Sequence, residues 1–566
     1  MTPDGRLLRG AVLAAVGAGL LAPIALGLWE TLRPAFGVLP ALGRTAWSLE
    51  PWAELAALPG VRTSLMLTLW TGIGSTVLSV LLALGAAAAL HDRIGGGRGG
   101  RWLTPFLAIP HAAMAVGLAF VLAPSGWLAR LLAEPLGWTR PPDLASVNDP
   151  LGLALMIGLM IKEIPFLLLV ILAGLGQLPV RRHMAMGRAL GYGRGIVWIK
   201  VIVPQLWPLI RLPVWVVLSY ALSNVDMALV LGPSTPPVLA VAVMRWFTDP
   251  DLAMLLPASA GAILQAGVVL AGVALFRAAE LAAARLGRWW LRRGGRGLSF
   301  EPGLVLARGL VLALLATGAL AMLSLAVWSV AWRWSFPHVL PESWSAKPWQ
   351  MAERGWREAL GNTLVLAAAS VAVSLALAVA WLEGEDRARR GRAGWAEALI
   401  YLPLLLPQIG FLYGLNVVFL RLGVGGTTLA VIWAQALFVF PYVMITLSDP
   451  WRALDPRLVN AAAALGASPW RRLWAVKLPV LLRPIATAAA IGVAVSVAQY
   501  LPTLFMGAGR VPTLTTEAVT LSSGADRRIV GVYATLQAAL PFAAYGLAFL
   551  VPALLHRNRA DLRGTA

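Results

Sequence analysis

Two stretches of the chain share one pattern: AMGRALGYGRGIVWIKVIVP at residues 185–204 and NAAAALGASPWRRLWAVKLP at residues 460–479. Each begins with a small-residue segment that favours a thin helix, continues with a glycine suited to a left-handed helix end, and closes on a proline that can open another helix. The glycines are Gly191 and Gly466, and the prolines are Pro204 and Pro479. The pattern predicts a short helix, a stop and a second helix that leads into a longer one.

The composition around these stretches is that of a membrane protein. Of the 566 residues, 59% are hydrophobic and 13% are charged, and the mean hydropathy is +0.76. An ordinary soluble domain has about 25% charged residues. A soluble fold of this length would therefore lack polar surface, and the same numbers exclude disorder.

Several kinds of site are excluded by the same sequence. The chain contains no cysteine, which rules out disulfides, iron–sulfur clusters and thiolate zinc sites. Its five histidines have no metal-binding spacing, and no glycine precedes a lysine as in a phosphate-binding loop. We therefore expect no cofactor, no metal and no ATP binding by this chain itself.

Twelve stretches are apolar and long enough to cross a bilayer. They are residues 10–29, 63–90, 102–123, 151–175, 206–230, 256–276, 304–331, 360–382, 396–420, 427–448, 480–500 and 531–555. This predicts an all-α integral membrane protein with about 12 transmembrane helices. Pro441 predicts an interruption of the tenth span, which neighbouring helices could tolerate.

The basic residues predict the orientation of the spans. Alternate connections, counted from the N-terminus, carry 29 Lys and Arg residues, and the other six carry 14. Because cytoplasmic loops are enriched in these residues, we expect both termini in the cytoplasm. The basic residues behind the net charge of +20 then set the topology and contact lipid headgroups. Because this accounts for the charge, we expect no nucleic-acid partner. The first apolar run lacks a clean small-x-small cleavage site, so we expect it to be retained as a span.

The two halves of the chain resemble each other. A shift of 275 positions aligns residues 189–191 with 464–466, and also Pro204 with Pro479, Gly232 with Gly507, Pro237 with Pro512 and Leu239 with Leu514. Further upstream, a shift of 297 aligns Pro110 with Pro407 and Gly117 with Gly414. Since each half crosses six times, these matches predict two parallel six-helix repeats about a pseudo-twofold axis along the membrane normal. The competing explanation is chance similarity among common small residues.

This organisation gives six expected segments. They are an N-terminal helix and external loop at 1–61, a first membrane domain at 62–276, a basic cytoplasmic linker at 277–303, a helix and external loop at 304–356, a second membrane domain at 357–555, and a cytoplasmic tail at 556–566.

The paired stretches resemble the EAA loop of bacterial ABC importer permeases: Glu-Ala-Ala, three residues, Gly, nine residues, Ile, one residue, Leu-Pro. The second copy matches it at Ala461, Ala462, Gly466 and Pro479, with Asn460 in place of the acid. The first copy keeps Gly191 and Pro204 and has Ala185, Gly187 and Ala189 in its helical part. The competing interpretation is a generic amphipathic surface loop. The chain as a whole looks most like the fused permeases of the thiamine and ferric-iron type.

The resemblance implies a type I ABC importer permease fold in a bacterial inner (cytoplasmic) membrane. It implies that both loops are coupling helices fitting a groove on a separate ABC ATPase subunit, present in two copies. It also implies a periplasmic or lipid-anchored solute-binding protein as the second partner. The chain itself would then not be an enzyme.

A few polar residues lie inside the predicted spans. Lys162 and Glu163 sit near the middle of the fourth span, where a charge is costly and marks a functional candidate by default. The alternative is a structural ion pair with another helix, or a misplaced span that leaves both residues nearer the surface. Four further candidates for the solute path close the fifth spans of the two halves, and the alternative for them is ordinary interhelical hydrogen bonding. They are Asn224, Asp226, Gln499 and Tyr500.

Two classes of function remain. One is the permease subunit of an ATP-driven importer, which forms the solute pathway. The other is an ion-coupled secondary transporter that uses Lys162 and Glu163, but it leaves the doubled loop unexplained. A third hypothesis, an intramembrane enzyme, is not supported, because the sequence shows no convergent set of catalytic residues.

Overall fold

The computed structural model describes residues 3–94, 103–293, 300–388 and 394–557. Most of the expected cytoplasmic tail, the middle of the expected linker and parts of two basic connections lie outside the described residues. Within them, ten helices are long and apolar enough to cross a membrane, or up to twelve if each of two bent pairs is one span. The all-α prediction is confirmed, apart from a short antiparallel hairpin of β1 (Ala331–Arg333) and β2 (Ser343–Trp344).

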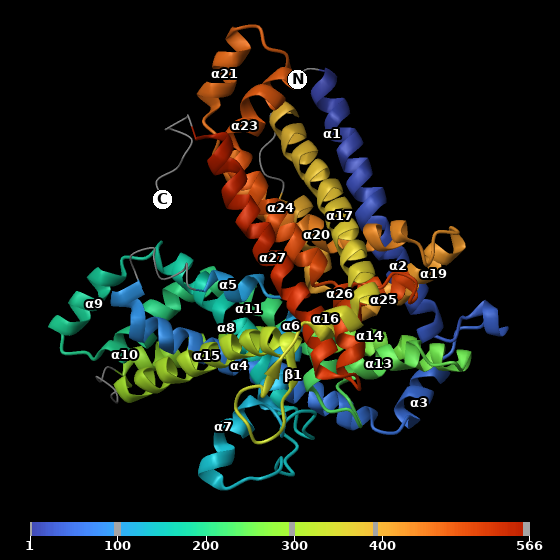
Figure 1. The fold of residues 1–566 in the computed structure, drawn as a ribbon. Helices are drawn as coiled ribbons and strands as arrows, with labels where there is room; N and C mark the ends of the chain where they lie inside the picture. The colour runs from blue at the N-terminus through green and yellow to red at the C-terminus, as the bar shows by residue number, and fades with distance from the viewer. Residues whose placement is uncertain (1–2, 95–102, 294–299, 389–393, 558–566) are drawn as a thin grey trace.

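The first half of the chain contains fourteen described helices (Figure 1). They are α1 (Pro3–Val16), α2 (Ala22–Ala35), α3 (Glu50–Ala57), α4 (Val61–Ile94), α5 (Thr104–Ala108), α6 (His111–Leu122), α7 (Trp127–Leu136), α8 (Leu153–Leu175), α9 (Val180–Ala189), α10 (Arg194–Val197), α11 (Val203–Ser223), α12 (Asp226–Leu231), α13 (Leu239–Phe247) and α14 (Leu255–Arg292).

The second half repeats this order without a counterpart of α7. Its described helices are α15 (Glu301–Val330), α16 (Lys347–Met351), α17 (Glu353–Ala388), α18 (Gly394–Leu405), α19 (Ile409–Arg421), α20 (Thr428–Arg452), α21 (Pro456–Ala464), α22 (Pro469–Arg472), α23 (Leu478–Val480), α24 (Leu482–Val497), α25 (Leu501–Gly507), α26 (Leu514–Ser522) and α27 (Arg527–Leu555).

The offset found in the sequence recurs in the helix ends. The starts of α8 and α20 are separated by that same offset, and so are the ends of α9 and α21. Helices α13 and α26 are equal in length and match at both ends under the same shift. Helix ends are set by backbone hydrogen bonds, so their agreement is a separate observation from the few residues that are identical in the two halves. The two halves therefore share one succession of helices from α8 to α13.

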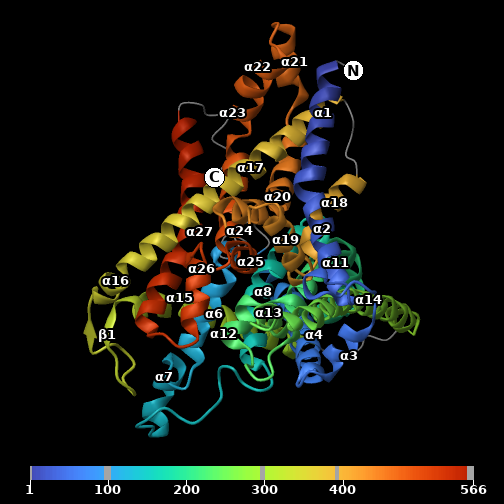
Figure 2. The same cartoon turned by 90° about the vertical axis from the view of Figure 1, so that its right-hand side faces the viewer.

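Each half holds the first helix of the other. Helices α1 and α2 pack on α17 and α19, and α15 packs on α4 and α6 (Figure 2). Glycines allow both crossings. A Cβ at Gly414 would lie 2.0 Å from the carbonyl oxygen of Gly27, and one at Gly117 would lie 2.5 Å from that of Ala321. The exchange joins the halves by close backbone contact.

The helix boundaries differ from the expected ones in several places. The first part of the expected linker at 277–303 is helical, because α14 continues to Arg292 through a run of the strong helix formers Ala, Leu, Glu and Arg. Pro441 does not interrupt the tenth span, since α20 runs through it. The chain bends instead by 111° between 399–405 and 409–421, where Pro407 disfavours helix at the residue before it.

The fifth spans also end earlier than expected. Helix α11 stops at Ser223 and α24 at Val497, and each is followed by a break and a separate short helix. A second bend, of 75°, separates residues 469–480 from 482–497. The apolar pattern of the sequence carries no sign of these breaks, because the residues after them are apolar as well.

Replacing Gly414 by alanine should destabilise the fold, because the new Cβ would overlap the backbone of α2. Overpacking of this kind costs about 1–3 kcal/mol. The matched control is Gly410→Ala on the same helix, where a Cβ would have 3.9 Å to its nearest neighbours. Thermal unfolding of the detergent-purified protein, followed by size-exclusion chromatography, should show a lower midpoint for Gly414→Ala only. Equal midpoints would contradict the close crossing.

Candidate coupling surface and solute path

The two loops with the shared sequence pattern fold into the same turn. Gly191 and Gly466 end α9 and α21 with φ of +77° and +80°, a left-handed conformation that suits glycine. The N–H of Tyr192 donates to the carbonyl of Gly187 at 2.9 Å, and that of Ala467 donates to Ala462 at 3.0 Å. These are the closing bonds of a Schellman-type helix end, made at equivalent positions of the two halves.

Each turn presents a leucine to solvent. Leu190 is 65% exposed and Leu465 is 88% exposed, and both directly precede the left-handed glycine. Every residue of α21 is at least partly exposed, and Figure 1 shows α21 and α9 projecting at separate ends of the molecule. Each loop region also exposes other large apolar side chains, Met186 in the first half and Leu458 and Trp470 in the second. Groups of exposed apolar side chains are typical of surfaces that receive a partner. The leucines stand in the sequence pattern, but only the structure showed that they are uncovered.

The helix after each turn contains a wider, π-helical turn at residues 198–202 and 473–477. These turns occupy equivalent positions of the two halves, and each ends just before the proline of its loop, Pro204 or Pro479. Such insertions are rare and are frequently found at functional sites. The structure therefore extends the similarity of the two loops beyond the residues that the sequence pattern singled out.

Charged residues attach the second loop to its own half. The ammonium of Lys477 donates to Glu383 at 2.7 Å and to Asp386 at 2.5 Å, both at the end of α17. Glu383 also accepts from Arg387 at 2.7 Å. The side chains of Lys477 and Glu383 are 6% and 4% exposed. This ionic cluster was not predicted, because residues 383 and 477 are far apart in the sequence.

The first loop is held differently. The carboxylate of Glu301, at the start of α15, accepts from the N–H of Gly195 at 3.5 Å. The imidazole of His91 stands edge-on to the indole of Trp198, with ring centroids 6.0 Å apart. The two loops thus share a backbone form, but the residues that attach each loop to its surroundings differ.

Lys162 and Glu163 have separate roles in the structure. The ammonium of Lys162 donates to the carbonyls of Phe106 and Ile109, at 2.8 and 2.6 Å, where α5 breaks before α6. Glu163 accepts from the hydroxyl of Ser79 at 2.8 Å, and its other oxygen is buried without a partner among the described residues. The contacts of Lys162 are those of a structural helix cap, which favours the structural alternative for this residue.

The four candidates that close the fifth spans lie at the breaks after α11 and α24. The side-chain oxygen of Asn224 accepts from the N–H of Ala228 at 3.1 Å, and its amide donates to Asp226 at 2.8 Å. Gln499 and Tyr500 occupy the matching break and are buried. The polar groups at the first break are therefore largely engaged with the short helix that follows it.

The two halves meet beside these breaks. Helix α12 contacts α26, α13 contacts α19, and α26 contacts α6. The ring of Phe247 stacks on that of Tyr413 with centroids 4.2 Å apart and stands edge-on to Phe505 at 6.2 Å. The short helices after each break are thus part of the contact between the halves.

An insertion in the first half, α7, contacts the second half at the β1–β2 hairpin. Arg130 of α7 donates to the carbonyls of Ser335 and His338 at 2.7 and 2.8 Å, and Trp127 donates to Val339 at 2.7 Å. These bonds tie α7 to the β1–β2 hairpin of the other half. Within the hairpin, hydrogen bonds from Ser335 lower the pKa of Glu342.

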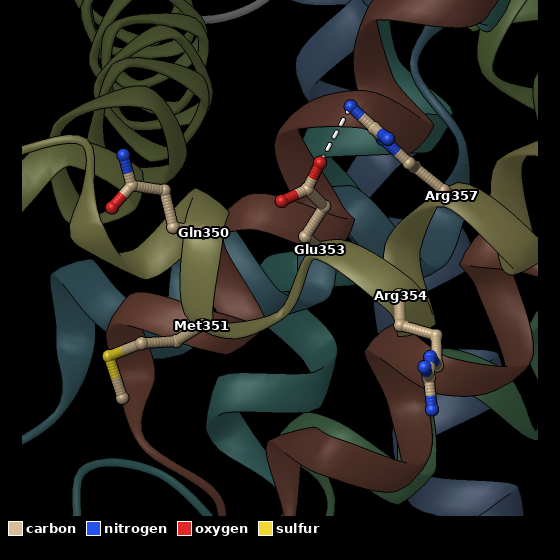
Figure 3. Close-up of a pocket in the computed structure, with 5 residues that line it drawn as sticks. All are labelled: Gln350, Met351, Glu353, Arg354 and Arg357. Carbon is tan, nitrogen blue, oxygen red and sulfur yellow. Dashed lines mark ion pairs between the residues drawn. The ribbon is translucent and has the colours of Figure 1, made fainter.

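A surface hollow of about 550 Å³ lies at the junction of α16 and α17 (Figure 3). Glu353 pairs with Arg357 at 2.6 Å across it, and Arg354 points away from this pair. All of its lining residues lie between 350 and 357. The hollow is therefore not formed between the halves and is a poor candidate for a solute path.

Comparison with known proteins gives the same class at the level of sequence. Residues 372–557 match the family described as binding-protein-dependent transport system inner membrane component. The chain is 31% identical over 552 residues to the inner membrane ABC transporter permease protein YnjC of Escherichia coli (strain K12), covering 95% of this chain and 98% of that protein. It is 28% identical over 456 residues to the thiamine transport system permease protein ThiP of Salmonella typhimurium, covering 76% and 78%. A shorter match, 31% over 156 residues, is to the molybdenum transport system permease protein ModB of Mycobacterium tuberculosis, covering 25% of this chain and 59% of that protein.

The fold and the full-length match define a multi-pass membrane protein with both permease halves on one polypeptide. The chain belongs to the family of inner-membrane permeases of binding-protein-dependent ABC importers. This confirms the resemblance inferred from the paired loops and the type I permease fold class.

Loss of the Lys477 ammonium should destabilise the second half. Removing one partner of a buried ion pair costs about 3–5 kcal/mol, and the lower end applies here because Glu383 keeps Arg387. Lys477→Met should therefore lower the unfolding midpoint clearly. The matched control is Arg357→Met, which breaks the exposed pair with Glu353 and should cost less than about 1 kcal/mol. Similar shifts for the two variants would show that the cluster contributes no more than a surface pair.

Proposed function

We propose that the chain forms the solute pathway of an ATP-driven importer and is driven through its two loops at 185–204 and 460–479. A separate ATPase must supply the energy, because the sequence has no phosphate-binding loop of its own. The observation that carries the proposal is the pair of exposed leucines, Leu190 and Leu465, on matching left-handed turns. Two equal, projecting apolar tips fit two equal grooves on a partner.

The proposal extends to partners and orientation. One ATPase copy docks on each loop, and both loops, the chain termini and the basic connections face the cytoplasm and its lipid headgroups. A solute-binding protein then delivers solute to the external side, to which the Lys and Arg counts assign the connections that contain α7 and the β1–β2 hairpin. The excess of Lys and Arg in alternate connections supports this orientation.

The solute path in this proposal runs between the halves, beside the breaks that carry Asn224, Asp226, Gln499 and Tyr500. Glu163 is a further candidate for the path, since one of its carboxylate oxygens is buried without a partner among the described residues. Lys162 is already bonded to two backbone carbonyls, so it is the weaker candidate. A secondary transporter that uses this pair as coupling groups would leave the two loops without a role.

The docking role of the loops can be tested at their exposed leucines. Leu465→Glu and Leu190→Glu place a charge where an apolar contact is expected. Burying an unpaired charge at such a contact costs several kcal/mol. Each variant should therefore reduce the amount of ATPase that co-purifies with the chain by about tenfold or more, since about 1.4 kcal/mol is a factor of ten. The measurement is the ratio of ATPase to permease after affinity purification from native membranes.

The control carries the same substitution away from the loops. Leu422→Glu lies in the connection after α19, is 61% exposed, and should leave the ratio unchanged. Because all three leucines are exposed, none of the variants should impair folding. Normal ATPase recovery with both loop variants would overturn the docking role.

The number of ATPase copies follows from having both halves on one chain. Native mass spectrometry of the purified complex should give one permease chain with two ATPase subunits. Two permease chains with two ATPases would contradict the idea that each loop of one chain receives its own subunit.

A further inference from the structure

Each half contains a segment that leaves the fifth span, breaks, and turns back along the protein. We call residues 224–247 and 499–522 the re-entrant segments; they contain α12 with α13 and α25 with α26. Both are flanked by long helices: α4 and α14 in the first half, and α17 and α27 in the second. Side chains of these flanking helices bond either the re-entrant segments or the last turn of the fifth span from which the segments start, at matching places.

The first matching bond comes from a buried glutamine of the last helix. In α14, the side-chain amide of Gln265 donates to the carbonyl of Leu222 at 2.9 Å. In α27, Gln537 donates to the hydroxyl of Thr515 at 2.7 Å, and that hydroxyl donates to the carbonyl of Val497. Leu222 and Val497 are equivalent under the shift that relates the halves, and both lie at the final turn of the fifth span. A glutamine of the last helix thus bonds the end of the fifth span directly in the first half, and through the hydroxyl of Thr515 in the second.

The second matching bond comes from a buried threonine of the second span. The hydroxyl of Thr68 in α4 accepts from the N–H of Leu239 at 2.8 Å, and that of Thr363 in α17 accepts from Leu514 at 3.1 Å. Leu239 and Leu514 are equivalent under the same shift, and each is the first residue of the returning helix, α13 or α26. The start of each returning helix is therefore bonded to the span beside it.

The four side chains are deeply buried. The two glutamines are 0% exposed, and Thr68 and Thr363 are 2% and 3% exposed. The Oε1 atoms of both glutamines are buried without a partner among the described residues. A buried polar group that is only half satisfied is costly, so packing alone would be better served by leucine or methionine. The recurrence of this costly arrangement in both halves indicates that the bonds to the re-entrant segments are required.

These bonds hold elements that form the contact between the halves. The returning helices α13 and α26 contact α19 and α6 of the opposite half, and Phe247 of α13 stacks on Tyr413. Each re-entrant segment is therefore bonded to its own half and packed against the other. If the bonds were lost, the segment could stay with the opposite half when the two separate.

We propose that Gln265 with Thr68, and Gln537 with Thr363, are two clamps that make each re-entrant segment move with its own half. These four residues position the helices that form the contact between the halves. They do not bind solute themselves. The inference rests on the transport role in the proposed function, but it does not depend on the docking role of the loops.

The absence of cysteine from the sequence allows a direct distance measurement. Thr248 and Ser523 are exposed residues at equivalent positions, directly after the ends of α13 and α26. Thr248→Cys and Ser523→Cys, introduced together, place one spin label on each returning helix. Electron double resonance of the full chain in lipid nanodiscs then reports the distance between the two segments, with no substrate needed.

Loss of a clamp should broaden this distance distribution. One buried hydrogen bond shifts an equilibrium by about tenfold. In Gln265→Met, Gln537→Met, Thr68→Val and Thr363→Val, the share of molecules outside the parent distance should therefore rise by a similar factor. Thr68→Ser keeps the hydroxyl and should restore the parent distribution, which a general packing defect would not do.

The matched control is Thr76→Val. Thr76 lies on α4 as Thr68 does, is 0% exposed, and donates to a carbonyl of its own helix, Gly72, at 2.8 Å. The Thr76→Val substitution should leave the distance distribution between the two spin labels unchanged, in protein that elutes as a folded monomer. If the glutamine variants fail to fold, the threonine series decides, because both of its members make the same isosteric change.

Two results would overturn the clamps. One is a parent-like distribution in all folded clamp variants, and the other is equal broadening by Thr68→Val and Thr76→Val. These outcomes are independent of ATPase recovery with Leu465→Glu. Normal recovery there, together with broadening here, would reject the docking role of the loops and leave the clamps standing.

Discussion

Inside a membrane, no water is available to hydrogen-bond the backbone groups that a broken helix leaves free, so the protein must bond them itself. The chain interrupts its spans at several depths, and each interruption frees backbone carbonyls and N–H groups. Side chains from neighbouring helices satisfy some of them: Lys162 at the break before α6, and Gln265 and Thr515 at the ends of the fifth spans. Many polar side chains inside the bundle therefore hydrogen-bond backbone groups. Only polar side chains without such a bond are available to bind a solute.

The two halves share a backbone plan but differ in their side chains. Turns, π-helical insertions and returning helices recur at one offset, whereas the attachments of the loops do not. Lys477 ties the second loop to acids at the end of α17, while the first loop rests on Glu301 and on the contact of His91 with Trp198. Backbone geometry is what a symmetric partner would recognise, so it is kept equal. The side-chain attachments are internal to each half and can diverge.

The exchanged first helices have a consequence for motion. Helix α2 lies against α19 through Gly27 and Gly414, and α15 lies against α6 through Gly117. If the halves move as the proposed function requires, each moving unit therefore contains helices from both parts of the sequence. Close backbone contact makes these crossings rigid. The re-entrant segments are the contrasting element, since they are bonded to one unit and packed against the other.

The sequence by itself determined the membrane class, an approximate number of spans, the similarity of the halves and the position of the paired loops. Each of these depends on local apolar length, on glycine and proline chemistry, or on residues at a fixed offset. Only the tertiary structure decided that Pro441 lies inside a continuous helix, that α14 extends to Arg292, and that Lys162 caps a helix end. It also brought Gln265 to Leu222 and Lys477 to Glu383. These pairings could not be predicted because a buried polar side chain is placed by the group it must satisfy, and that group lies on a distant segment of the chain.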